Sequence, residues 1–192
     1  MKPPKEVVVP IAAHAFAIEN ARTFYKVART ISTSSGVDMT DAEMLTYRVN
    51  ASFAIELYLK TLMVSARGGR VTKGHSLMQL FASYPDFLKD CIEHHYLAQR
   101  PEAGWEITMR ALTFRDSPPP APSDSPAPQY ASFQQLVATL NNAFESSRYF
   151  YEHLNDKDWQ IYDYSPGPVE AAMAALDATY EFHRAGGFAA KN

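Results

Sequence analysis

The stretch from Thr40 to Arg67 constrains the fold of this 192-residue chain more than any other. It opens with Thr40 and Glu43, the spacing of a capping box, in which each side chain binds a backbone N–H left unpaired at a helix start. It closes at Gly68 and Gly69, because glycine readily adopts the left-handed conformation common at helix ends. The sequence therefore predicts one long helix from Thr40 to Arg67.

The polar residues of this helix form a narrow ridge. Four of them recur at every fourth position: Arg48, Ser52, Glu56 and Lys60. Side chains at this spacing lie within about 40° of each other around a helix, so the other, apolar faces must be buried. Two interpretations of the ridge stay open. Glu56 and Lys60 form an ion pair on a solvated face, contributing about 0.3 to 0.5 kcal/mol, or the ridge faces another helix or a cleft.

Apolar periodicity predicts further helices around this one. The expected ranges are 11–31, 75–83, 86–99, 131–154 and 169–183. Residues 101–116 stay open, since the stretch from Trp105 to Phe114 fits neither the helical period nor the alternation of a strand. The proline-rich segment 117–128 predicts an extended, mobile surface loop, because proline lacks the N–H that regular structure needs.

These elements predict an all-α fold, a bundle of four to five principal helices with a Pro-rich surface loop. We expect one domain over residues 1–192, with a core at about 12–154 and a C-terminal helix at about 169–183. A chain of this length can bury one sizeable core, and its 46% hydrophobic residues can offset the entropy lost on folding.

Charge and composition narrow the classes of function. A net charge of -3 argues against attraction of nucleic acid or anionic lipid to the whole surface, so any polyanion site must be local. The single cysteine, Cys91, excludes an internal disulfide and favours a reducing compartment. We see no export signal and no run of about 18 apolar residues, so we expect a cytoplasmic protein without a membrane span.

Common motifs of cofactor and metal sites are missing. The sequence has no Walker A segment, no glycine-rich dinucleotide turn and no nucleophile elbow, so we expect no cofactor. Cys91 and His95 lie one helical turn apart, but two ligands do not complete a zinc site. We therefore expect no metal site.

A basic turn follows the long helix, with Arg67, Arg70, Lys73 and His75 beside glycine residues. Phosphate could be held there by charge and by exposed backbone N–H groups. Alternatively, Arg67 neutralises the helix C-terminus and the other side chains are merely solvated. Taken alone, the turn favours this second interpretation.

Arg148 and His153 carry the strongest chemical signal, near the end of the predicted helix 131–154. The planar cation of arginine suits phosphate, and histidine exchanges a proton near neutral pH, so the two can serve metal-independent RNA cleavage. Five residues place them about 140° apart on an ideal helix. They can act together only if the helix end is distorted or a second subunit contributes.

Three segments, in this order, resemble the HEPN superfamily of small helical bundles. They are residues 50–62 with Glu56 and Lys60, residues 74–81 with His75, and residues 148–153 from Arg148 to His153. The resemblance covers roughly residues 12–154. It implies a helical bundle, a homodimer and association with RNA or nucleotides. Many members are metal-independent ribonucleases of defence or toxin systems, marked by arginine and, four to six residues later, histidine.

The resemblance implies catalytic roles for Arg148, which would hold phosphate, and His153, the acid or base for attack by the 2′-hydroxyl. The catalytic form of the family usually has a polar residue directly after the arginine, whereas this chain has Tyr149. We therefore favour a noncatalytic module that binds RNA, a nucleotide or a protein partner. Its predicted binding residues are Glu56, Lys60, Arg70, Lys73, His75, Arg148, Tyr151 and Glu152.

Overall fold

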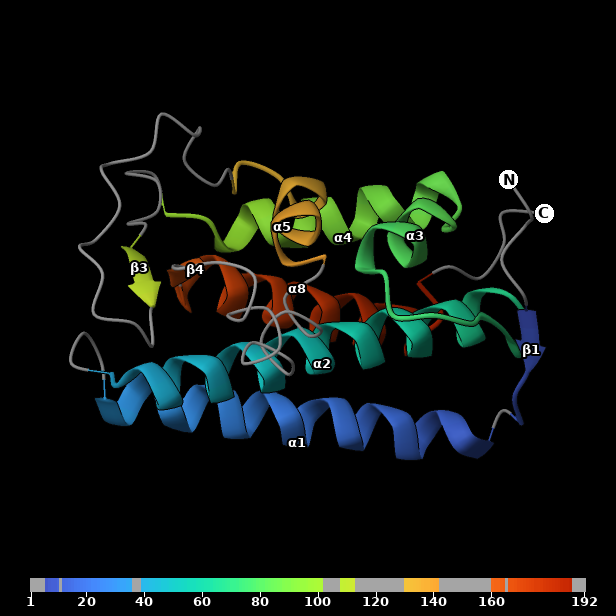
Figure 1. Cartoon of the computed structure of the whole chain (residues 1–192). Coiled ribbons are helices and arrows are strands. Elements are labelled where there is room, and N and C mark those ends of the chain that lie inside the picture. Colours follow the sequence, from blue (N-terminus) through green and yellow to red (C-terminus); the bar gives the residue numbers. More distant parts are fainter. Residues whose placement is uncertain are drawn as a thin grey trace.

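The computed structural model describes residues 6–10, 12–35, 39–101, 108–112, 130–141, 160–164 and 166–187. Two predicted features lie outside these residues, the Pro-rich loop at 117–128 and the segment from Arg148 to His153. The described chain is predominantly helical and forms a bundle, as the sequence predicts (Figure 1). None of its described helices is long and apolar enough to cross a membrane.

Four long helices make up the body of the bundle. They are α1 (Ala12–Ser35), α2 (Asp41–Ala66), α4 (Asp86–Gln99) and α8 (Pro166–Arg184). In Figure 1, α1 lies along one side of the bundle and α2 packs on it. Helix α8 lies between α2 and α4 and packs against both. Two short helices, α3 (Leu77–Ala82) and α5 (Phe133–Leu140), pack against each other beside α2 and α4. Helix α2 is thus surrounded by other elements.

Both ends of α2 follow from local sequence. The Thr40 side chain accepts a hydrogen bond from the Glu43 backbone N–H, and the Glu43 carboxylate accepts one from the Thr40 N–H at 2.8 Å. The predicted capping box is confirmed. At the other end, Gly68 and Gly69 have φ values of 57° and 92°, a backbone conformation that residues with a Cβ atom rarely adopt. The Gly69 N–H donates to the carbonyl of Val64 at 2.8 Å and closes the helix.

The polar ridge of α2 is buried along most of its length. Arg48 is 8% exposed, Ser52 is 1% exposed and Glu56 is 2% exposed. Only Lys60, at the end of the ridge, keeps a substantial part of its side chain in solvent. Of the two interpretations of this ridge, a solvated face is therefore wrong.

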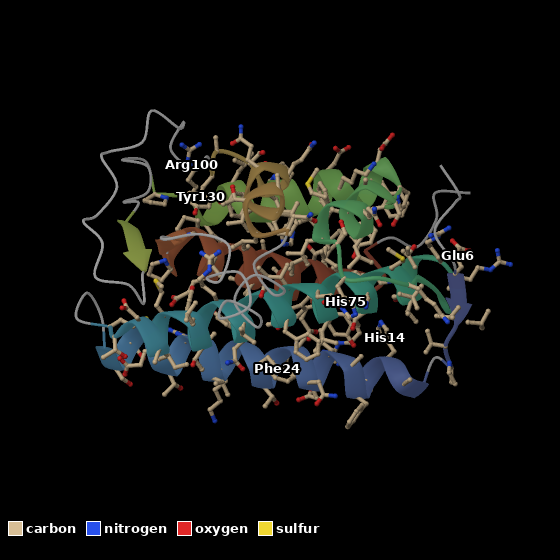
Figure 2. All side chains as sticks on the ribbon, in the orientation of Figure 1. Glu6, His14, Phe24, His75, Arg100 and Tyr130 are labelled. Carbon is tan, nitrogen blue, oxygen red and sulfur yellow. The ribbon has the colours of Figure 1, made fainter. Side chains whose placement is uncertain are left out.

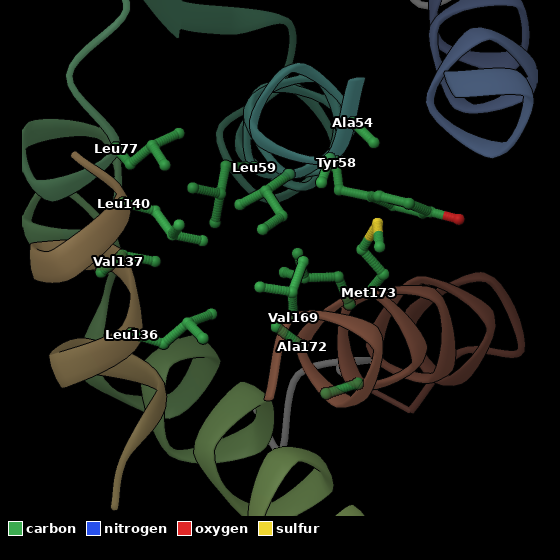
Figure 3. Close-up of a cluster of buried hydrophobic side chains, with 14 of the residues drawn as sticks. Ala54, Tyr58, Leu59, Leu77, Leu136, Val137, Leu140, Val169, Ala172 and Met173 are labelled. Carbon is green, nitrogen blue, oxygen red and sulfur yellow. The ribbon is translucent and has the colours of Figure 1, made fainter. Parts of the chain in front are cut away.

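The part of the core drawn in Figure 3 gathers side chains from α2, α3, α5 and α8, and helices α1 and α4 contribute further buried side chains. Tyr58 reaches from α2 to α8, where its hydroxyl donates to Asp177 Oδ1 at 3.1 Å. Arg22 of α1 donates to the same oxygen at 2.9 Å and to Glu181 Oε1 at 2.6 Å. This polar group ties α1, α2 and α8 together at the edge of the apolar core. The labelled core residues are Ala54, Tyr58, Leu59, Leu77, Leu136, Val137, Leu140, Val169, Ala172 and Met173.

Two short strand pairs accompany the helices of this predominantly helical fold. Strand β1 (Glu6–Val8) pairs antiparallel with β2 (Arg70–Thr72), the first part of the stretch expected as a basic turn. Strand β3 (Thr108–Leu112) pairs with β4 (Gln160–Tyr164). The open stretch at 101–116 thus contains a strand, and the expected connection before α8 contains its partner. Each pair joins chain segments far apart in sequence, so neither has a strong local signal.

Candidate functional site

A buried carboxylate lies at the centre of the candidate site. Glu56 Oε1 accepts a hydrogen bond from Lys60 Nζ at 2.6 Å, and Glu56 is only 2% exposed. His75 Nδ1 lies 2.9 Å from Oε1 and 3.1 Å from Oε2 of the same carboxylate. We call these three residues the Glu56 cluster. The structure thus brings together three of the residues that the sequence predicts for binding.

Two different elements position the partners of Glu56. Lys60 lies one helical turn further along α2, where residues four apart share a face. His75 comes from the segment between β2 and α3, directly before Ser76, the N-cap of α3. Asn141 Oδ1 accepts from Ser76 Oγ at 2.9 Å and from the Met78 N–H at 3.0 Å. Asn141, which follows α5, therefore anchors the backbone next to His75.

The carboxylate determines the tautomer of the neutral His75 ring. An ionised carboxylate can only accept hydrogen bonds, so Nδ1 carries the proton and Nε2 carries the lone pair. The His75 side chain is 57% exposed and that of Lys60 is 25% exposed. A buried anion thus holds an ammonium and an imidazole at the surface. Such a group can bind an anion, and its imidazole can exchange a proton.

Further cations flank the Glu56 cluster on the strand and turn that lead to His75. Arg70 and Lys73 are exposed, and neither forms an ion pair with another described residue. Arg67 differs, because it pairs with Glu6 of β1 at 2.6 Å. The Gly69 N–H is bonded to the Val64 carbonyl, so it is not one of the exposed amides expected in this turn. The exposed cations Arg70 and Lys73 remain as groups that this turn offers to a phosphate.

The structure describes five of the predicted site residues, namely Glu56, Lys60, Arg70, Lys73 and His75. The other four, Arg148, Tyr151, Glu152 and His153, lie outside the described residues.

Sequence reasoning missed Asn141. The only sequence signal for Asn141 is its position at the C-terminal end of α5. Asparagine is common at helix ends because it tolerates the left-handed backbone conformation, so this position does not indicate a role in the site. Its contact with Ser76 spans 65 residues, which no local pattern predicts.

Cys91 and the other described histidines are not arranged as a metal site. Cys91 Sγ lies 3.9 Å from His95 Nε2, one turn along α4. Burial raises the pKa of the Cys91 thiol, which disfavours the thiolate that binds metals. Within the described ranges, no three His, Cys, Asp or Glu side chains are grouped so that they could hold a metal ion.

Comparison with known proteins finds no match for this chain. No protein-family model matches the chain. No curated protein and no solved structure matches it either. The resemblance of three segments to the HEPN superfamily stays a prediction from sequence.

Proposed function

We propose that this chain binds RNA or a nucleotide through phosphate groups, without catalysing a reaction. One observation carries the proposal. The buried carboxylate of Glu56 holds Lys60 and His75 at the surface, and the exposed cations Arg70 and Lys73 precede His75 by a few residues along the chain. The binding surface consists of the Glu56 cluster with these two cations.

Lys60 and His75 can bind phosphate while they keep their contact with Glu56. The ammonium of Lys60 has three N–H donors, and the hydrogen bond to Glu56 uses one of them. His75 becomes a cation with two donors when its ring is protonated. Because Glu56 restricts both side chains beforehand, less rotamer entropy is lost when a ligand binds. Hydrogen bonds between such charged donors and phosphate are stronger than those between neutral groups.

The number of cations favours an oligonucleotide over a single nucleotide. Lys60, Arg70, Lys73 and a protonated His75 provide up to four cations, so several phosphates of one strand can each contact a cation. A local basic surface of this kind is compatible with the net charge of -3, because close contacts depend on nearby charges.

Binding of a labelled single-stranded RNA, followed by fluorescence anisotropy, tests the proposal. The double variant Arg70→Gln/Lys73→Gln should weaken binding at least about tenfold, because two phosphate contacts are lost. The matched control is Lys26→Gln/Arg29→Gln, which removes two exposed cations from α1. The control should bind nearly as well as the wild type. Equal affinities of the two double variants would contradict the proposed surface.

The same samples separate binding from catalysis. The alternative function is a metal-independent ribonuclease in which Arg148 and His153 act on the RNA. We expect the RNA to stay intact after long incubation with the wild type and a chelator. Cleavage that disappears in His153→Ala would instead establish the ribonuclease and overturn the noncatalytic proposal.

The HEPN resemblance also leads us to propose a homodimer. Light scattering after size-exclusion chromatography should give twice the chain mass of 21.5 kDa. A mass that stays at the monomer value at high concentration would contradict it.

A further inference from the structure

Helix α1 carries a row of uncharged residues at coiled-coil spacing. Its members recur at alternating intervals of three and four residues, the 3.5-residue period of helices that wind around each other. Phe16 is 72% exposed and Val27 is 42% exposed, and the other members are exposed or half-buried. We call this row the α1 seam, and its six members are Ala13, Phe16, Asn20, Thr23, Val27 and Thr30.

The α1 seam lies away from the face of α1 that packs in the bundle. Ala21 and Ala28 are buried in the core, and at 100° per residue Phe16 lies about 140° around the helix from Ala21. Phe24, which is labelled in Figure 2, packs against Phe53 of α2 with ring centroids 4.6 Å apart. Other side chains of α1 project away from the bundle in the same view. The seam is therefore accessible to a partner helix.

The threonine residues of the seam can be buried at little cost. The Thr23 hydroxyl donates to the carbonyl of Glu19 at 2.8 Å. The Thr30 hydroxyl donates to the carbonyl of Lys26 at 2.9 Å. Both hydroxyls keep these partners when a second helix covers them, so no buried donor is left unsatisfied. Asn20 is the seam residue with a side-chain amide, and one asparagine at such a position fixes the register of paired helices.

The charges beside the seam favour a second copy of this chain as the partner. Glu19 and Lys26 lie seven residues apart, so they follow the same flank of the seam. In an antiparallel pair of α1 helices related by two-fold symmetry, these flanks face each other. The register that sets Phe16 opposite Val27 of the second copy also sets Glu19 opposite Lys26 of that copy, because the midpoints of the two residue pairs differ by one position. Each dimer then gains two ion pairs.

We infer that two copies of this chain associate through an antiparallel pairing of their α1 seams. Such a contact closes after two subunits, since both copies use the same surface. The Glu19 side chain is 70% exposed, and Arg22 contacts its Oε1 at 3.3 Å, so Oε2 can accept from Lys26. A parallel pair would instead set the charges against the flank with Phe24 and Ile31, which offers no counter-charge. The inference rests on the proposed homodimer, whose contact surface it names, and does not depend on RNA binding.

Sedimentation equilibrium in the absence of RNA tests the seam. Phe16→Ala should weaken dimerisation at least about tenfold, because a large exposed aromatic side chain of the contact is lost. The matched control is Leu97→Ala, which shortens a 47% exposed side chain on α4 and should dimerise like the wild type. A dimer that Phe16→Ala does not weaken would overturn the inference but leave the homodimer established. A wild type that stays monomeric at high concentration would overturn both.

A charge exchange tests the antiparallel register. Lys26→Glu sets carboxylates opposite each other across the contact and should weaken dimerisation at least about tenfold. The double variant Glu19→Lys/Lys26→Glu restores opposite charges and should recover most of the affinity. Residues 19 and 26 lie about 10.5 Å apart along one helix, so the recovery reports a contact between copies. Arg29→Glu, the same charge change at an exposed residue of α1 outside the seam, should leave dimerisation unchanged. A double variant that dimerised as poorly as Lys26→Glu would contradict the register.

Discussion

Lys60 Nζ lies 2.6 Å from Glu56 Oε1, one turn away on α2, and the carboxylate side chain is only 2% exposed. At full exposure such a pair contributes about 0.3 to 0.5 kcal/mol. Burial changes the consequence of losing a partner, since a desolvated charge without its counterpart is costly. We therefore expect the Glu56 cluster to contribute to the free energy of unfolding as well as to ligand binding.

Glu56→Gln should lower the free energy of unfolding by about 1 to 3 kcal/mol, because Lys60 and His75 both lose a charged acceptor. The loss stays below that of a fully buried pair, since Lys60 is 25% exposed. Urea unfolding measures it. Glu19→Gln is the matched control, an ion-pair partner of Arg22 with a 70% exposed side chain, and should cost less than about 0.5 kcal/mol. Similar small losses for both variants would contradict the buried role of Glu56.

Tyr58 should make stability depend on alkaline pH. Burial, together with the nearby Asp177 carboxylate, raises the pKa of Tyr58 well above its ordinary value of about 10. The folded chain then keeps a proton that the unfolded chain has lost, so this stability is complete below pH 10 and falls above it. Tyr58→Phe should cost about 0.5 to 1.5 kcal/mol at pH 7. Its unfolding free energy should fall less steeply above pH 10, and parallel curves would contradict the assignment.

Leu59→Ala should destabilise the protein by about 2 to 5 kcal/mol, as expected for a large-to-small change at a fully buried leucine. Ser52→Ala should cost far less, although Ser52 is also buried. Its hydroxyl donates at 2.6 Å to the carbonyl of Arg48, a contact within one helix that alanine can lose without leaving a buried donor. Denaturant midpoints of the two variants provide the comparison. Equal losses would show that α2 is packed differently.

Asn141→Ala should affect stability and RNA binding together. The variant removes the acceptor of Ser76 Oγ and of the Met78 N–H, at a cost of about 1 to 2 kcal/mol. Because His75 directly precedes Ser76, RNA affinity should also fall. The control Gln135→Ala removes another polar contact of α5, in which Gln135 Oε1 accepts a hydrogen bond from the Ala131 N–H, and it should leave RNA affinity unchanged. If Asn141→Ala unfolds more easily but binds RNA normally, the anchoring of His75 is not needed for binding.

The helices were predictable wherever their ends carry local chemistry. The capping box at Thr40 involves residues that are neighbours in sequence, and so does the start of α4, which Pro85 precedes. Helix α4 occupies the predicted range of 86–99. Helix α1 runs to Ser35, past the expected end at residue 31. The hydroxyls of Thr33 and Ser34 donate to carbonyls four residues earlier, at 2.8 Å and 2.6 Å. The hydroxyl groups of these polar residues thus find acceptors within α1, so the residues expected to end the helix are accommodated in its last turn.

The rest of the site depends on contacts across the fold. Periodicity placed Glu56 and Lys60 on one ridge, but it does not reveal whether other elements cover that ridge. The contact of Glu56 with His75 spans 19 residues and requires β2 to direct the chain back along α2. Strand β1 is equally non-local, since Val7 faces Val71 across three-residue strands. Short strands of this kind have little propensity of their own.

The salt dependence of RNA affinity tests the central claim most directly, because its slope reports how many phosphates the protein contacts. For single strands, the logarithm of the binding constant falls with the logarithm of salt concentration by about 0.7 per contacted phosphate. Removing Arg70 and Lys73 together should therefore make the slope shallower by about 1.4 relative to the wild type, while Lys26→Gln/Arg29→Gln leaves it unchanged. If Arg70→Gln/Lys73→Gln kept the wild-type slope, phosphate would not be bound beside the Glu56 cluster.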